Sequence, residues 1–405
     1  MNFKVKISIR RDGYLAALAL RIIERTLLNG INWKGPLLPY ISLVSFGVDA
    51  LITALLVIAF FHGAARSSNT YLKYGMILCL LAVSAWITKQ TTLIYSAAFI
   101  ILAEGIPFAQ IRRVCYLSAM GSLLLLTACR FAGLILEQNV NFDYGIGNAM
   151  GMAHPNNLAA TVAVVLLLWG YGKRRQNIWK VIPIVLGVSV ITYTFTLSRT
   201  TLVIMVTYCL ALILLALLEF VHAQSLIRII RIGFVLLLAG SIWATMGSEA
   251  FFAGLRLPSN SGLNHLLSAM GRFLNASNLL EKHGIHLFGS YIEFRSLRTA
   301  LLTGQEAVIL DSAYMYLLIN QGLVATIIYT WFFTRAMRNQ VRAKQYVLLI
   351  TMSVFMISCL MESYALDASM NFCLLTAFSS LETDQYELTK MREPDRNSGE
   401  DEKGS

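Results

Sequence analysis

Charged residues are scarce in this sequence. Asp, Glu, Lys and Arg make up 14% of the 405 residues, whereas hydrophobic residues make up 57% and the mean hydropathy is +0.63. An ordinary soluble domain carries about 25% charged residues. The composition therefore excludes a soluble globular protein and indicates an integral membrane protein.

Three further absences narrow the class. The chain lacks the short segments of alternating polarity that indicate a transmembrane β-barrel. Its first residues, "MNFKVKISIRRDGYLAALAL", are basic and then apolar, but no small-residue cleavage site follows, so we expect this segment to be retained. The six cysteines lie in apolar runs without the paired spacing of a metal or redox site, which is typical of core residues.

Apolar runs of about 20 residues recur along the chain, and about 20 helical residues cross a hydrocarbon core. We predict an all-α, polytopic integral membrane protein with about twelve transmembrane helices. The predicted spans are 13–30, 37–61, 70–88, 91–108, 114–136, 155–171, 178–197, 200–221, 229–248, 310–334, 345–362 and 366–382. The first contains Arg21, Glu24 and Arg25 and could instead lie along the membrane interface, which would leave eleven spans.

The basic residues predict the orientation of these spans. When loops are assigned alternately to the two sides, one set holds sixteen lysines and arginines, and the short loops of the other set hold only Lys34, Lys89 and Arg199. The positive-inside rule then places both termini in the cytoplasm, with the chain in the cytoplasmic (inner) membrane. The formal charge of +11 thus reports orientation and does not indicate a nucleic-acid partner.

Two segments differ from the spans. Residues 249–309, between the nine spans of 1–248 and the three of 310–382, form a long external loop, and loops of this length usually carry function. Within it, "SAMGRFLNASNLLEKHGIHLFGS" has helical spacing of apolar positions and predicts a helix on or near the membrane surface. Residues 383–405 are polar without periodicity and predict a disordered cytoplasmic tail.

Polar residues from distant segments fall together on the external side. Four inward-running spans begin there, near His154, Arg199, Asp311 and Asp367. A helix N-terminus carries about half a positive charge and favours anions, and a guanidinium group, such as that of Arg199 or Arg272, binds phosphate oxygens in pairs. We predict an external pocket for phosphate or diphosphate.

Simpler interpretations remain open at this level. His154, with Asn156 and Asn157 behind it, is also typical of a helix N-cap and turn, and Asp311 is typical of a helix cap. His283 and His286 are three residues apart, but the spacing supplies no third ligand, so we predict no metal site.

Four motifs, in this order and at these spacings, resemble a known family. They are "GMAHPNNLA", "TLSRTTL", "GRF" in a long loop that ends in "LFGS", and "DSAYMYLLINQGL". Together they resemble the O-antigen ligase and Wzy-type polysaccharide polymerase family. The resemblance covers roughly residues 145–325, and the twelve-span layout agrees with it outside that core.

The resemblance implies an inverting, metal-independent glycosyl transfer, without a cofactor, on the outer face of the cytoplasmic membrane. The substrate would be an undecaprenyl-diphosphate-linked oligosaccharide, and a flippase and a chain-length regulator are the implied partners. Arg199 and Arg272 match the family's arginines, which would bind the diphosphate and stabilise its charge. The implied substrate-binding residues are His154, Asn156, Asn157, Tyr314 and Asp367.

One motif separates the two branches of the family. Where the ligases have His-Asn-x-Tyr, with a histidine proposed as catalytic, this chain has Asp311, Ser312, Ala313 and Tyr314. The difference favours a polymerase of the capsule or exopolysaccharide type. Asp311 is then the first candidate for the general base, and His283 the second.

Two alternatives stay open. A ligase would transfer the finished glycan to a lipid or a protein. A lipid-linked-oligosaccharide flippase or another transporter would carry ionisable residues or broken helices within the membrane.

Overall fold

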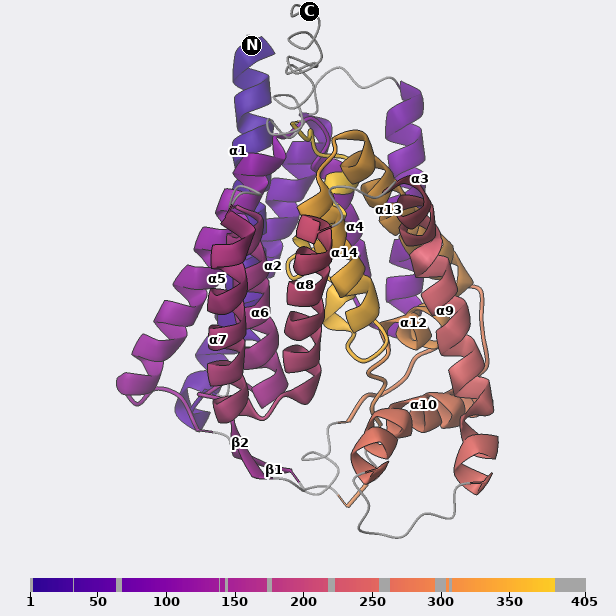
Figure 1. Cartoon of the computed structure of the whole chain (residues 1–405). Helices are drawn as coiled ribbons and strands as arrows, with labels where there is room; N and C mark the ends of the chain where they lie inside the picture. Colours follow the sequence, from indigo (N-terminus) through magenta and orange to yellow (C-terminus); the bar gives the residue numbers. More distant parts are fainter. Residues whose placement is uncertain are drawn as a thin grey trace, which may run out of the picture.

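The computed structural model describes residues 3–382, except for 32, 63–67, 138, 143–144, 173–176, 218–222, 255–262, 296–303 and 306–307. The predicted tail, 383–405, and parts of the predicted loop lie outside the described residues. The described part is a helical membrane protein (Figure 1). Six of its helices are long and apolar enough to cross a membrane: Gly35–Phe61, Ser68–Thr88, Phe108–Phe131, Ile178–Thr196, Arg199–Leu217 and Ala313–Arg342. Twelve spans are not confirmed.

Most predicted spans correspond to helices. The first half of the chain forms α1 (Phe3–Ile23), which continues as the π-helical turn η1 (Glu24–Leu28), then the 3-10 turn η2 (Gly35–Leu37), α2 (Leu38–Phe61), α3 (Ser68–Thr88), α4 (Thr92–Leu102), α5 (Phe108–Phe131) and α6 (Pro155–Tyr171). The second half forms α7 (Ile178–Thr196), α8 (Arg199–Leu217), α9 (Ala223–Gly254), α10 (Leu263–His283), α12 (Ala313–Met315), the π-helical η5 (Tyr316–Gln321), α13 (Gly322–Arg342) and α14 (Tyr346–Ser358).

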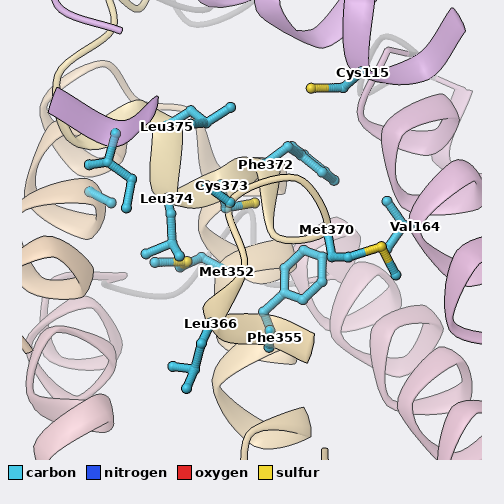
Figure 2. Close-up of a cluster of buried hydrophobic side chains, with 14 of the residues drawn as sticks. Cys115, Val164, Met352, Phe355, Leu366, Met370, Phe372, Cys373, Leu374 and Leu375 are labelled. Carbon is cyan, nitrogen blue, oxygen red and sulfur yellow. The ribbon is translucent and has the colours of Figure 1, made fainter. Parts of the chain in front are cut away.

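The twelfth predicted span, 366–382, is wrong as a helix. The 3-10 turn η6 (Tyr364–Leu366) ends where this segment begins, and the segment contains one further 3-10 turn, η7 (Phe372–Ala377). Its residues are almost all buried. Figure 2 shows the segment among neighbouring helices, with Phe372 and Cys373 packed in the apolar core. The chain still returns toward the start of α5, where Ser380 exchanges backbone hydrogen bonds with Ile106 and Phe108.

Side chains supply hydrogen-bond partners to the irregular backbone of this segment. Backbone groups inside a membrane protein need partners, so irregular backbone at that depth is tolerated only when it is buried in protein. Arg335 and Asn339 of α13 donate to the carbonyl oxygen of Ala377 at 2.8 Å each, and Asn371 donates to the carbonyl of Ala365 at 2.9 Å. An apolar run this short does not reveal whether its residues are helical or simply buried.

A small hairpin, which the sequence analysis did not predict, separates α5 from α6. Strands β1 (Asn139–Phe142) and β2 (Gly145–Asn148) pair antiparallel, with Asn139 opposite Asn148. The hairpin and α10 lie at the same end of the bundle, opposite the first turns of α1 (Figure 1). We call this end the α10 end.

The predicted helix in the long loop is confirmed as α10. Ala276 and Leu279 on one face of α10 pack against Leu310, Met315, Leu318 and Ile319 of the segment that leads into η5. This apolar face of α10 therefore packs against the rest of the protein, and α10 lies over the end of the helical bundle.

Candidate functional site

Arg272 of α10 is at the centre of a group of charged side chains. Its Nε atom lies 3.2 Å from Oδ2 of Asp311, and its Nη1 atom lies 3.5 Å from Oε1 of Glu362. The same Nη1 donates a hydrogen bond to the carbonyl oxygen of Met361. The three side chains belong to α10, to the segment before α12 and to the segment after α14, so only the folded chain brings them together.

Asp311 lies just before α12 and does not cap it. The N-cap is Ser312, whose hydroxyl accepts a hydrogen bond from the backbone N–H of Met315 at 3.5 Å. The capping interpretation of Asp311 is therefore wrong. Its carboxylate remains available to pair with Arg272, and its side chain is 34% exposed.

Glu362 was not among the predicted site residues, although it lies close to Arg272 and Asp311 in the structure. It lies four residues beyond the end of α14, and its side chain is 17% exposed. The only signal in the sequence was its place in "MESYALDASMNF", next to the end of an apolar run. A polar residue at the end of an apolar run is equally typical of a position that only marks the end of a transmembrane span.

His154 is the N-cap of α6. Its Nδ1 atom accepts a hydrogen bond from the backbone N–H of Asn156 at 3.1 Å, and Pro155 occupies the first helical position. The capping interpretation is thus confirmed. Because Nδ1 accepts, the neutral ring carries its proton on Nε2.

The four residues also share an electrostatic environment. Burial raises the pKa of Glu362 to about 7, against the lowering effect of Arg272. Burial also raises the pKa of Asp311, while Arg272 and His154 lower it. The pKa of His154 is lowered by burial, and among the charges that act on it are Asp311 and Arg272. We call His154, Arg272, Asp311 and Glu362 the site cluster.

Arg199 is placed as predicted but outside this cluster. It begins α8 after a two-residue connection from α7, in which Leu197 adopts a left-handed conformation with φ of 54°. Among the described residues, the charges that act on His154 and Asp311 do not include Arg199. Its neighbours Ser198 and Thr201 line a small cavity of about 10 Å³ between α6, α7 and α8.

His283, the second candidate for the base, is at the wrong end of α10. Eleven residues separate it from Arg272, which is about 16 Å along a helix axis. The ring is near the C-terminus of α10, where Gly284 ends the helix with φ of 67°. Its pKa is lowered, first by burial and then by Lys282 and His286.

The remaining predicted contacts divide between surface and interior. Asn156 is half-buried and Asn157 is exposed in the first turn of α6, beside the site cluster. Tyr314 is fully buried instead, and its hydroxyl donates to the carbonyl of Met356 at 2.8 Å. Its ring packs against Phe234, so Tyr314 belongs to the apolar core.

Asp367 was predicted to begin a span and to bind substrate. The structure contradicts the first role, because Asp367 follows the 3-10 turn η6 and precedes irregular backbone. It is 4% exposed, pairs with Arg25 and accepts hydrogen bonds from the N–H and hydroxyl of Ser369 at 2.9 and 2.7 Å. Nearby on η1, Glu24 is fully buried and accepts from Arg21 at 2.7 Å, while Arg21 also pairs with Asp49 at 3.3 Å. We call Arg21, Glu24, Arg25, Asp49 and Asp367 the anchor cluster.

Comparisons with known proteins give no independent identification. No protein-family model matches the chain, and neither does a curated protein or a solved structure. The functional argument therefore rests on the residues themselves.

Proposed function

We propose that the chain is a membrane glycosyltransferase that joins polyprenyl-diphosphate-linked oligosaccharide repeat units outside the cytoplasmic membrane. The observation that supports this proposal is the site cluster. It combines one guanidinium group, two carboxylates and a neutral imidazole, contributed by four separate segments at one end of a helical membrane bundle.

Each group has a role in the proposed transfer. The acceptor hydroxyl forms a bond to the anomeric carbon of the donor sugar while the bond between that carbon and the diphosphate oxygen breaks. Arg272 stabilises the charge that collects on the leaving diphosphate. Glu362 takes the proton of the hydroxyl, since a base works best when its pKa is close to the working pH.

In this mechanism Asp311 orients Arg272 and is not the general base that the sequence predicted. Its carboxylate holds the Nε side of Arg272, and Glu362 lies on the Nη1 side. When the donor diphosphate binds Arg272, it would weaken the pairing of the guanidinium with Glu362 and free that carboxylate for the acceptor. His154, at the start of α6, would line the donor side.

The test is reconstitution of the full chain in proteoliposomes with lipid-linked repeat units. Products of two or more joined units would support the polymerase, and Arg272→Ala should abolish them at an unchanged protein level. Units transferred to a lipid or protein acceptor, without chain extension, would instead identify a ligase. If neither product forms, the glycosyltransferase proposal is wrong.

A transporter is the second candidate because of one observation. The candidate span Ala313–Arg342 is interrupted at Gly322, which has φ of 90°, and the segment after α14 is irregular and buried. Broken helices of this kind often surround substrate sites in transporters. Translocated but unmodified lipid-linked units in the same proteoliposomes would favour this function over the enzyme.

A further inference from the structure

Two glycines from distant parts of the chain are in direct backbone contact at the break before α13. Gly289 has φ of 85° and Gly322 has φ of 90°, a region that favours glycine. A Cβ atom on Gly289 would lie 1.9 Å from the carbonyl oxygen of Asn320, and one on Gly322 would lie 2.2 Å from the nitrogen of Gly289. Since both neighbouring atoms are backbone, neither position has room for a side chain.

The segment 284–290 satisfies the backbone at this break. The first N–H groups of a helix have no partner within the helix. Here the N–H groups of Leu323 and Val324, in the first turn of α13, donate to the carbonyls of His286 and Leu287 at 3.1 and 3.0 Å. Residues of the long loop thus supply the acceptors that the first turn of α13 lacks within the helix.

Asn320 closes the contact from the other side. Its carbonyl accepts from the N–H of Ser290 at 2.9 Å, and its side-chain amide donates to the carbonyl of Ser290 at 3.0 Å. Gln321 ties the same turn to α3, because the hydroxyl of Ser84 donates to its backbone carbonyl at 2.8 Å. We call Gly289, Ser290, Asn320, Gln321 and Gly322 the clamp.

Both partners of the central ion pair are attached to the clamp by short pieces of chain. Arg272 is on α10, whose last residue, His283, is six residues before Gly289. Asp311 is nine residues before Asn320 and follows Val308, which exchanges two backbone hydrogen bonds of 3.0 Å with Arg295. The clamp therefore joins the piece of chain that follows Arg272 to the piece of chain that follows Asp311.

We propose that Gly289, Gly322 and Asn320 are positioning residues, which hold α10 so that Arg272 reaches Asp311 and Glu362. Without the clamp, α10 would keep its apolar contacts with α9 and the end of the bundle but would lose its fixed connection to the start of α13. Its helix would form as before, but Arg272 would sample positions away from the carboxylates. The effect on turnover rests on the proposed function, whereas the effect on geometry does not.

The test compares Gly289→Ala with Gly304→Ala in the full-length protein. Gly304 has a similar φ of 66° and belongs to the same long loop, but a Cβ atom there meets nothing within 4 Å. The control therefore separates strain at a positive φ from the backbone clash. We expect at least about tenfold faster hydrogen exchange at the amides of Ser290, Leu323 and Val324 in Gly289→Ala only, the ratio that corresponds to about 1.4 kcal/mol.

A second measurement follows the site itself. A short bismaleimide can join the side chains introduced by Arg272→Cys and Asp311→Cys, in a chain that also carries Cys79→Ser because Cys79 is exposed. The added Gly289→Ala change should lower the cross-linking rate at least about fivefold, and Gly304→Ala should leave it unchanged. Asn320→Ala keeps the backbone contact and removes the side-chain hydrogen bonds to Ser290 and Gln321. It provides the same test if Gly289→Ala does not fold.

The outcomes separate the two proposals. An unchanged cross-linking rate in both clamp variants would overturn the positioning role. A wild-type protein that polymerises lipid-linked units, together with a Gly289→Ala protein that turns over at the same rate, would do the same while leaving the function intact. Slower cross-linking in a protein without glycosyl transfer would leave the clamp in place and reject the function.

Discussion

Two groups of ionised residues, the anchor cluster and the site cluster, differ in how completely their charges are paired. In the anchor cluster, Asp367 is held by Arg25 and by two donors of Ser369, and Glu24 is fully buried against Arg21. In the site cluster, one guanidinium serves two partly exposed carboxylates. The first arrangement fixes the chain, whereas the second leaves a carboxylate that can exchange a proton.

The pKa of Glu362 bears on its capacity to exchange a proton. Burial raises this pKa to about 7, because its effect outweighs the lowering by Arg272. A group with such a pKa can accept a proton under physiological conditions. The comparison therefore predicts that changes in the site cluster affect activity and that changes in the anchor cluster affect stability.

The largest effect is expected for Glu362→Gln. Loss of a general base typically lowers turnover by about 10²- to 10⁴-fold, while the amide can still accept from Arg272. In the unchanged protein, turnover should rise with pH up to about 7 as Glu362 loses its proton, and this limb should disappear in the variant. The measurement is kcat against pH in proteoliposomes; a limb that survives in Glu362→Gln would return the role of base to Asp311.

The stability of the folded protein should change with pH in the direction opposite to turnover. Because the pKa of Glu362 is raised in the folded state, the protonated form is favoured by folding, and stability should fall as pH rises from about 4.5 to about 7. Glu362→Gln should remove that loss. Thermal unfolding of the two proteins across this pH range checks the sign.

Asp367→Ala should instead lower the free energy of unfolding, because it breaks the ion pair with Arg25 in the anchor cluster. Breaking a fully buried ion pair costs about 3 to 5 kcal/mol, and we expect the lower end of this range or less because the side chain of Arg25 stays 31% exposed. Thermal unfolding in detergent measures the loss. Asp12→Ala is the matched control, since Asp12 pairs with Arg11 on the surface of α1 at 57% exposure, where such pairs contribute little. Equal losses in the two variants would contradict the comparison.

A smaller effect on stability is expected for His154→Ala. The change removes an N-cap hydrogen bond, which typically costs about 1 kcal/mol. His154→Asn keeps a capping acceptor but removes the imidazole, so it should restore stability. A further loss of activity in His154→Asn would show that the ring acts on the substrate and not only on the start of α6.

The sequence located elements better than it located partners. The bounds of α6 agree with the predicted span 155–171, and the short connection before Arg199 is present, because hydrophobic runs and proline at a helix start are local signals. The proximity of Arg272, Asp311 and His154 was also anticipated from the side of the membrane on which each falls. Glu362 and the clamp were not, since both depend on contacts between distant segments.

The failures have physical causes as well. An apolar run specifies burial but not backbone conformation, so residues 366–382 were predicted as a helix although Asn371, Arg335 and Asn339 satisfy an irregular backbone there. A polar residue next to a span specifies a boundary but not its neighbours. Tyr314 and Asp367 were therefore assigned to substrate, whereas the structure places both in the interior.

What the sequence determined by itself is the environment: too few charges for a soluble fold, enough long apolar runs for a bundle, and polar residues gathered at the ends of those runs. What only the tertiary structure decided is which of these polar residues meet, and how completely each charge is paired. Hydrophobicity acts on each segment separately and is readable along the chain. Ion pairing and close contact between glycines depend on ångström distances between segments that the chain separates by many residues.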